Sequence, residues 1–330
     1  MKVVIPGGSG QVGGVLARHF LAAGDEVVLL SRRADASASE SFGAKVVAWD
    51  GCREGPWQRE LDGADVVINL AGRSVDCRYH AANRRQMLDS RVDSTRAVGR
   101  AIAAASRPPR VWLQASTATI YRHAYDRPQD EATGELGGNE PDAPAKWRFS
   151  IEVAKAWEAA AREFDLPGVR LVLLRSAMTM SPDRGGIFGV LLGLVRRGLG
   201  GTCGDGRQYV SWIHDCDFVR AIDWLIARDD FSGPVNLASP HPLPNAEFMR
   251  ELRQAWETPL GLPAARWMLE AGAVVLRTES ELVLKSRRVV PGRLLGAGFG
   301  FEFPEWRTAA IDLCRRWRGE GRLAMQESCG

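Results

Sequence analysis

The chain has 330 residues, enough for one large domain or two ordinary ones, and its 45% hydrophobic and 25% charged residues are typical of a soluble globular protein. The net charge of +3 is small and neither sign runs in blocks, so nothing indicates a nucleic-acid partner. The six cysteines are widely spaced without a Cys-x-x-Cys pair, which argues against the usual zinc spacings and favours reduced thiols and no metal.

No segment of the sequence favours a membrane. The opening "MKVVIPGGSG" has an apolar stretch that Pro6 interrupts early, which is too short for a signal peptide. No later apolar run reaches the length of a membrane span. We therefore predict a cytoplasmic protein with no membrane partner.

Short apolar runs alternate with amphipathic stretches in the first half of the chain. Buried strands are predicted at 2–5, 26–30, 44–49, 64–72, 110–116 and 169–175. Helices are predicted at 13–24, 84–106 and 149–164. This alternation, with right-handed crossovers, predicts an α/β protein with a doubly wound parallel sheet, the Rossmann fold.

The regular alternation of predicted strands and helices ends at about Ser176, where glycine-rich loops lengthen and strands become sparse. We assign residues 1–175 to the Rossmann domain. A helix followed by a strand at about 212–238 indicates that the chain returns to this domain. Residues 176–211 and 239–330 are predicted to form a smaller α/β region on the substrate side.

The loop after the first strand, "IPGGSGQVGG", contains the spacing Gly-x-Gly-x-x-Gly between a strand and a helix. The first glycine permits a sharp turn, the second lets a pyrophosphate approach the backbone, and the third lets the helix pack close to the strand. The helix N-terminus then offers free N–H groups to phosphates. The alternative is a purely structural turn. The predicted dinucleotide-binding residues are Gly7, Gly8, Ser9, Gly10, Gln11, Val12 and Gly13.

The end of the second strand decides which dinucleotide is expected. A site for NAD carries Asp or Glu there, whereas this chain has Ser31 and Arg32. A guanidinium binds the 2′-phosphate that a carboxylate would repel, so NADP(H) is predicted. The alternative is that Arg32 is an ordinary solvated arginine.

Three landmarks in order, "GGSGQVG", "NLAG" (69–72) and "ASTATIY" (115–121), resemble the extended short-chain dehydrogenase/reductase superfamily. Segments 200–217, 233–248 and 289–304 resemble its atypical, epimerase-like family often called YfcH-like, whose members carry a short C-terminal domain of unknown function. The resemblance covers nearly the whole chain. It implies cofactor contacts by Asp50 (to the adenine), Leu70, Ala71, Gly72 and Ser116.

Catalysis in this superfamily uses a Ser or Thr hydroxyl, a Tyr that transfers a proton, and a Lys four residues later that lowers the pKa of that Tyr and holds the nicotinamide ribose. Thr117 matches the hydroxyl position in "TATIY", with Ser116 as the alternative. The Tyr-x-x-x-Lys is missing, because Phe149, Ser150 or Ile151 stands where the tyrosine belongs. A different proton donor is therefore required.

Two residues are candidates for that proton transfer. Tyr121 follows Thr117 and is a surrogate donor or a pocket-lining residue. His214 in "SWIHDCD" is a proton shuttle or a structural hydrogen-bonding residue. Asp217 is expected to cap the helix that follows.

Arg207, Gln208 and Trp212 are predicted to line the substrate pocket, with packing as the alternative for Trp212. Val210 stands where relatives that act on nucleotide sugars usually carry an arginine, which argues against that substrate class. The basic residues at 285–288 are interpreted as a solvated face.

These observations predict an NADP(H)-dependent, epimerase-like oxidoreductase acting on an unidentified small molecule. The main alternative is a non-catalytic NADP(H)-binding sensor, which the missing Tyr and Lys favour. A nucleotide-sugar epimerase or dehydratase is a third hypothesis, opposed by Val210. We expect a monomer or a homodimer.

Overall fold

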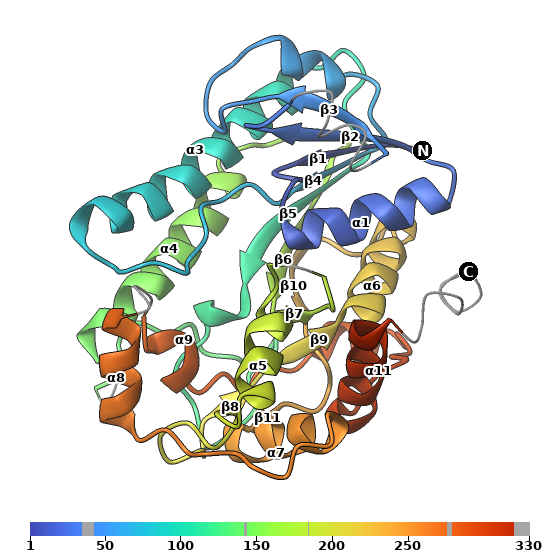
Figure 1. Ribbon diagram of the computed structural model, residues 1–330. Coiled ribbons are helices and arrows are strands. Elements are labelled where there is room, and N and C mark those ends of the chain that lie inside the picture. Colours follow the sequence, from blue (N-terminus) through green and yellow to red (C-terminus); the bar gives the residue numbers. More distant parts are fainter. Residues whose placement is uncertain (35–42, 142–143, 184, 276–278, 320–330) are drawn as a thin grey trace.

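A seven-stranded parallel sheet forms the centre of the upper part of the molecule in Figure 1. The computed structural model describes residues 1–34, 43–141, 144–183, 185–275 and 279–319. The strand order is β3-β2-β1-β4-β5-β6-β10, and every pairing is parallel, which confirms the predicted doubly wound fold. The strands are β1 (Lys2–Pro6), β2 (Glu26–Ser31), β3 (Lys45–Ala48), β4 (Val66–Asn69), β5 (Val111–Thr117), β6 (Arg170–Ser176) and β10 (Gly233–Leu237).

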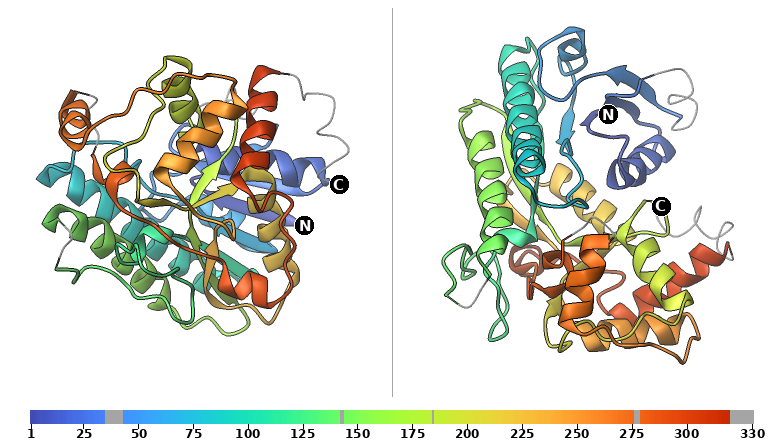
Figure 2. Two further views of the ribbon diagram at one scale, coloured as in Figure 1. Left: turned by 90° about the horizontal axis from the view of Figure 1, so that it is seen from below. Right: turned by 60° about the vertical axis from the view of Figure 1, so that its left-hand side comes forward.

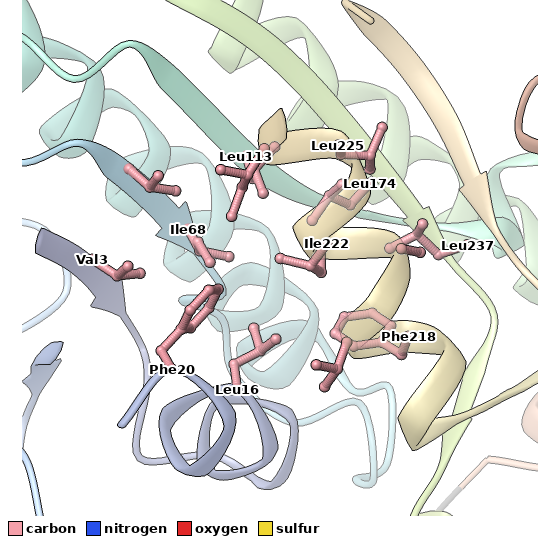
Figure 3. Packing of buried hydrophobic residues seen from close by; sticks show 14 of the residues in the cluster. Val3, Leu16, Phe20, Ile68, Leu113, Leu174, Phe218, Ile222, Leu225 and Leu237 are labelled. Atoms are coloured by element: carbon pink, nitrogen blue, oxygen red, sulfur yellow. The ribbon is translucent and has the colours of Figure 1, made fainter. Parts of the chain in front are cut away.

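Helices cover both faces of the sheet (Figures 1 and 2). Helices α1 (Gln11–Ala22) and α6 (Asp215–Ala227) pack on one face, and α3 (Ala81–Ala104) and α4 (Ala145–Arg162) pack on the other. Figure 3 shows the first face, where Leu16 and Phe20 of α1 and Phe218, Ile222 and Leu225 of α6 meet residues of the strands.

The two-sided burial explains why the strands are continuous apolar runs. Val3 and Ile5 pack in the cluster beneath α1 and α6, whereas Val4 packs in the cluster beneath α3 and α4. Successive side chains of a strand point to opposite faces, so both faces need apolar residues. Burying each such side chain stabilises the fold by roughly 1.5–3 kcal/mol.

The lower part of the molecule in Figure 1 holds most of the remaining elements, whereas α10 (Gly292–Gly296) packs against β10 of the main sheet. Two short sheets lie in the lower part, a parallel pair of β7 with β9 and an antiparallel pair of β8 with β11. The elements are β7 (Met178–Met180), α5 (Ile187–Arg196), β8 (Tyr209–Val210), β9 (Trp212–His214), β11 (Leu243–Pro244), α7 (Asn245–Ala255), α8 (Arg266–Val275), α9 (Glu281–Leu284), α10 (Gly292–Gly296) and α11 (Trp306–Arg318).

A third core holds this lower part together. Trp306 of α11 stacks on Phe248 of α7 at 4.0 Å between ring centroids and meets Trp212 of β9 edge-on at 4.9 Å. Strand β9 pairs with β7. After β9 the chain returns to the main sheet through α6, which begins at Asp215, and then through β10, which pairs with β6. In the described part of the chain, no strand after β10 joins the main sheet.

In the residues that the structure describes, two short 3₁₀ helices lie in the connections. They are η1 (Pro56–Glu60), which follows β3, and η2 (Ala118–Ile120), which follows β5. Among the described helices, none is both long enough and apolar enough to cross a bilayer.

Candidate functional site

The glycine turn after β1 is packed tightly against the rest of the fold. Gly7 has a φ of +78°, and a Cβ there would lie 2.7 Å from the backbone N and Cα of Ala71. A Cβ on Gly13 would lie 2.3 Å from the carbonyl oxygen of Gly8. These glycines allow α1 and the end of β4 to approach the turn.

Gly10 is different, because the fold itself does not require a glycine there. Its φ of −78° suits any residue, and the nearest atom to an added Cβ is the carbonyl oxygen of Gly7 at 3.6 Å. The backbone N–H groups of Gln11, Val12 and Gly13 donate to none of the described residues, and no side chain caps α1. The buried Nε2 of Gln11 also has no partner in the described chain. This open helix N-terminus fits a pyrophosphate.

The end of β2 fits a further phosphate. Ser31 is buried, and its hydroxyl donates to the hydroxyl of Ser9 at 2.9 Å, which ties β2 to the glycine turn. Arg32 is exposed and forms no ion pair with a described residue. Its guanidinium is therefore available to a ligand.

Asp50 stabilises its own turn, and its predicted contact with adenine stays a prediction. Its Oδ1 accepts from the backbone N–H of Cys52 at 2.9 Å and of Arg53 at 2.8 Å. The N–H of Arg53 is the largest cause of the lowered pKa of Asp50. The carboxylate thus stabilises the turn after β3.

The segment after β4 lies beside the glycine turn. Asn69 accepts from the backbone N–H of Ala71 at 3.1 Å through Oδ1 and donates to Gln114 of β5 at 2.9 Å through Nδ2. This buried amide fixes the path of Leu70, Ala71 and Gly72. The backbone of these predicted cofactor residues therefore lies at the carboxyl edge of the sheet.

The two neighbouring hydroxyls at the end of β5 have different surroundings. Ser116 is buried and donates its hydroxyl proton to Oε1 of Glu158 at 2.8 Å, so it has no proton left to donate to a ligand, and its predicted cofactor contact stays a prediction. Thr117 is half-buried, and its Oγ1 accepts from the backbone N–H of Thr119 at 3.1 Å. With that lone pair occupied, the Thr117 hydroxyl proton can be donated to a ligand.

Tyr121 belongs to a buried network, which contradicts its predicted role as proton donor. The side chain is 1% exposed, and its hydroxyl donates to Oδ1 of Asn236 at 3.0 Å and accepts from Arg175 at 2.9 Å. Burial is the largest cause of the raised pKa of Tyr121. Arg175 also holds Glu158 at 2.7 and 2.9 Å, which completes the network at the ends of β5, β6 and β10.

His214 is structural, and its predicted role as a proton shuttle is contradicted by its surroundings. The ring is fully buried and stacks on Phe303 at 3.9 Å. Nδ1 accepts from the backbone N–H of Cys216, so His214 is the N-cap of α6. Nε2 lies 3.2 Å from Oδ2 of Asp312. Asp217, predicted as the cap, accepts instead from the backbone N–H groups of residues 302 and 303.

The ion pairs around His214 join α6 to α11. Burial acts to raise the pKa of Asp312, but the hydrogen bond with His214 and the charge of Arg316 outweigh it and lower that pKa to about 2. Arg316 also donates to both carboxylate oxygens of Asp215, from Nη1 at 2.8 Å and from Nη2 at 2.6 Å. His214, Asp215 and Cys216 offer ligand atoms within 4.8 Å of one another, yet this pairing already satisfies the carboxylate. The cluster is explained without a metal.

Two of the three predicted pocket residues are buried in the lower core. Trp212 is fully buried, and packing, the alternative interpretation, is correct for it. Gln208 is 2% exposed and donates to the carbonyl oxygens of Cys203 and Val283. Arg207 is exposed, with its guanidinium 5.9 Å from the ring centroid of Tyr125, and stays a candidate.

The helix positions of the missing Tyr and Lys are occupied by residues that serve packing. Ser150 donates to Oε2 of Glu281 on α9 at 2.7 Å. Ile151 is buried. Lys155 donates to the carbonyl oxygen of Gly137 at 2.7 Å. None of these side chains supplies a phenol beside a lysine.

A buried lysine in contact with Thr119 was missed by the sequence analysis. Lys285 is 2% exposed and donates to the carbonyl oxygen of Thr119 at 2.9 Å. Burial, followed by the charge of Arg287, lowers the pKa of Lys285 to about 7. Nε of Arg287 donates to Oγ1 of Thr119 at 3.1 Å. The interpretation of 285–288 as a solvated face is therefore wrong for Lys285, and no local pattern in a run of basic residues would reveal it.

The sheet topology and the open glycine turn define a class of dinucleotide-binding proteins, and comparison with known proteins identifies the family. Residues 3–238 match the NAD dependent epimerase/dehydratase family, and residues 264–313 match a domain of unknown function, DUF1731. The chain belongs to the NAD dependent epimerase/dehydratase family. The resemblance inferred from the sequence landmarks, with its C-terminal domain of unknown function, is confirmed.

Similar proteins match the chain along nearly its whole length. It is 32% identical over 320 residues to the epimerase family protein SDR39U1 of Bos taurus, covering 95% of this chain and 99% of that protein. It is 33% identical over 307 residues to the epimerase family protein Mb2239 of Mycobacterium bovis, covering 91% and 93%.

Solved structures give the same result. The crystal structure of human epimerase family protein SDR39U1 with NADPH has a TM-score of 0.80 and 27% identity, covering 96% of this chain and 99% of that chain. The nucleoside-diphosphate sugar epimerase from Corynebacterium glutamicum has a TM-score of 0.72 and 26% identity, covering 95% of this chain and 58% of that chain.

Proposed function

We propose that this protein is an NADP(H)-dependent, epimerase-like oxidoreductase acting on a small molecule that is not a nucleotide sugar. The observation that carries the proposal is the open N-terminus of α1, where three backbone N–H groups and the glycine at position 10 have no function within the described chain. The similar human protein crystallised with NADPH supports the same cofactor.

The residues at the edge of β1 and β2 would hold this cofactor. The first-turn amides of α1 bind the diphosphate. Arg32 binds the 2′-phosphate through its planar guanidinium. The backbone of Leu70, Ala71 and Gly72 lines the path toward β5. When bound, the nicotinamide supplies or accepts a hydride.

Two side chains of this protein would handle the substrate oxygen. The hydroxyl of Thr117 donates to that oxygen and orients it, since its lone pair is engaged by the N–H of Thr119. We assign the proton to Nζ of Lys285, which lies against the same Thr119 and whose pKa of about 7 permits both protonation states near neutrality. In the reductive direction the ammonium gives its proton to the substrate oxygen and becomes a neutral amine.

The substrate class follows from the side chains around Val210. Val210 is buried and apolar, so it cannot clamp a diphosphate. Arg207 is exposed on the neighbouring loop and faces Tyr125. Without a diphosphate clamp at Val210, we propose a small substrate. Its recognition is assigned to the connected polar residues Thr119, Lys285 and Arg287.

Hydride transfer is tested with stereospecifically deuterated NADPH incubated with the protein and a metabolite pool. We expect label in a product, and a loss of labelling with Thr117→Ala. The control is Thr133→Ala, whose hydroxyl bonds only within its own turn. Labelling that survives Thr117→Ala unchanged would contradict the assigned role of this hydroxyl.

Cofactor choice is tested with Arg32→Glu. The charge reversal repels the 2′-phosphate, so the Kd for NADPH should rise at least about tenfold while that for NADH changes little. Arg53→Glu, the same charge reversal at another exposed arginine, on the turn after β3, is the control. An unchanged preference for NADPH in Arg32→Glu would overturn the cofactor assignment.

A non-catalytic NADP(H)-binding sensor is the second candidate. It is favoured by the helix positions of the missing pair, where Ser150 and Lys155 are committed to internal hydrogen bonds. Tight NADPH binding without label transfer from any pool would support it. A cytoplasmic location and a monomer or homodimer are proposed for either candidate.

A further inference from the structure

One buried arginine lacks a counter-ion. Among the described residues, two arginines are buried, Arg91 on α3 and Arg175 on β6. Arg175 donates to both oxygens of Glu158, at 2.7 and 2.9 Å. Arg91 forms no ion pair in the described chain. Its Nη1 donates to the carbonyl oxygen of Met87 at 3.1 Å, and its guanidinium lies 4.9 Å from the ring centroid of Trp157.

The groups that face Arg91 do not neutralise it. The titratable side chains that act on it are the phenol of Tyr79, whose pKa burial raises to about 12, and the thiol of Cys77, and neither is a carboxylate. Burial lowers the pKa of Arg91 to about 10, which still leaves the guanidinium charged. A buried charge without a partner is costly, so its retention needs a compensating group. Only one of the five N–H donors of this guanidinium has a partner among the described residues.

The guanidinium of Arg91 lies at the carboxyl edge of the sheet, beside the segment that follows β4. A Cβ on Gly72 would lie 3.3 Å from Cγ and 3.4 Å from Cζ of Arg91, so the guanidinium is directly beside Gly72. Gly72 is exposed, and its missing side chain leaves that side of the guanidinium uncovered. The preceding residue, Ala71, is the one that Gly7 of the glycine turn approaches.

We propose that Arg91 binds an oxyanion, a phosphate or a carboxylate, of a ligand held at the carboxyl end of β4. A planar guanidinium pairs with such a group through two parallel hydrogen bonds. The inference rests on the proposed function and deepens it. The oxyanion belongs either to the diphosphate of the dinucleotide or to an acidic group of a substrate bound beside it.

The stability of the free protein separates this role from a structural one. Arg91→Met removes an unpaired charge, so the melting temperature should stay unchanged or rise. Arg175→Met removes the buried cation that holds both oxygens of Glu158 and leaves it only the half-exposed Arg162 as an ion-pair partner among the described residues, so the melting temperature should fall by about 5–10 °C. Arg85→Met is the matched control, because it removes the same charge from an 84% exposed side chain of the same helix.

Ligand titrations separate the two sources of the oxyanion. If it is the diphosphate, Arg91→Met should weaken NADPH at least tenfold and leave 2′-AMP, which lacks both phosphates of the diphosphate, unchanged. If it is a substrate acid, NADPH affinity should be unchanged. Inorganic phosphate at constant ionic strength should then raise the melting temperature of the NADPH-loaded wild type but not of Arg91→Met. Arg91→Lys, which keeps the charge, should recover part of either response.

Two results would have different meanings. The inference is overturned if Arg91→Met melts as low as Arg175→Met and responds to NADPH and phosphate as Arg85→Met does. If the wild type binds no nicotinamide cofactor while phosphate still stabilises it through Arg91, the proposed function fails and the oxyanion site stands.

Discussion

The two halves of the sheet's carboxyl edge are built differently. At the ends of β1 and β2, the donors are free: the first-turn amides of α1 and the guanidinium of Arg32 have no partners among the described residues. At the ends of β5 and β6, Ser116 is bonded to Glu158 and Tyr121 to Arg175, and only the Thr117 hydroxyl keeps a proton for a ligand among these three side chains. The first half therefore offers free donors to a ligand, mostly from the backbone. The second is a rigid network, so its chemistry depends on side chains from other elements.

The largest expected effect concerns Lys285, the residue that the lower part of the molecule brings to the β5 half. Lys285→Met should lower the rate of hydride transfer by about 10²–10⁴-fold, because the proton donor is lost. NADPH affinity should change little. In the wild type, the reductive rate should fall as the pH rises through about 7, because the donor is the ammonium form.

The pH profile distinguishes a proton donor from a packing residue. Arg288→Met is the control, since Arg288 bonds to the carbonyl oxygens of Tyr125 and Asp126 and should leave the profile unchanged. A wild-type rate that stays flat from about one pH unit below the pKa of Lys285 to about one unit above it would remove this lysine from the mechanism.

The next effect tests the rigidity of the β5 and β6 half. Glu158→Ala leaves Arg175 buried without its partner, so the free energy of unfolding in a urea titration should fall by about 3–5 kcal/mol. Glu163→Ala, which removes an exposed partner of Arg96 at the end of α4, should cost at most about 1 kcal/mol. Equal losses from the two variants would show that the buried network is not what stabilises this half.

A pair of glycine variants sharpens the comparison on the β1 side. Gly13→Ala places a Cβ 2.3 Å from the carbonyl oxygen of Gly8 and should lower the free energy of unfolding by about 1–3 kcal/mol. Gly10→Ala meets nothing closer than 3.6 Å and should leave stability within about 0.5 kcal/mol. The same Gly10→Ala should weaken NADPH binding in a fluorescence titration. Unchanged NADPH affinity in this variant would mean that the open turn is structural.

The last effect is confined to acid conditions and concerns the stability provided by the His214 cluster. The pKa of Asp312 is lowered to about 2 from an ordinary 3.8, so its stabilisation is present above about pH 4 and is lost as the pH falls from about 4 to about 2. The loss amounts to about 2 kcal/mol. Asp312→Asn should remove this part of the pH dependence while the binding of NADPH is kept. Matching acid curves for variant and wild type would contradict the pairing with His214.

The fold and the glycine turn were predictable because their signals are local. Alternating apolar runs follow directly from strands buried on both faces, and the glycine spacing follows from close approaches within a few residues, such as Gly13 against Gly8. Thr117, which the sequence favours over Ser116, is the less buried of the two hydroxyl residues, although its chemical role stays a prediction.

The side chains around the reaction site were not predictable in the same way. His214 and Trp212 lie in one short segment, and nothing in that segment shows that the ring of one meets Asp312 or that the other packs on Trp306. A tyrosine beside Thr117 resembles a proton donor until its contacts with Arg175 and Asn236 are known. In each case the deciding partner lies in another element.

The sequence by itself determined the class of this protein: a doubly wound sheet with an open glycine turn, expected to hold NADP(H). The tertiary structure alone decided which polar groups are free. Lys285 reaches Thr119 across 166 residues of chain, and Arg91 lies beside Gly72 without a carboxylate among the described residues. The physical reason is the sequence separation of the interacting residues. Backbone geometry is set by neighbours along the chain, whereas burial and charge pairing depend on residues that only the folded chain brings together.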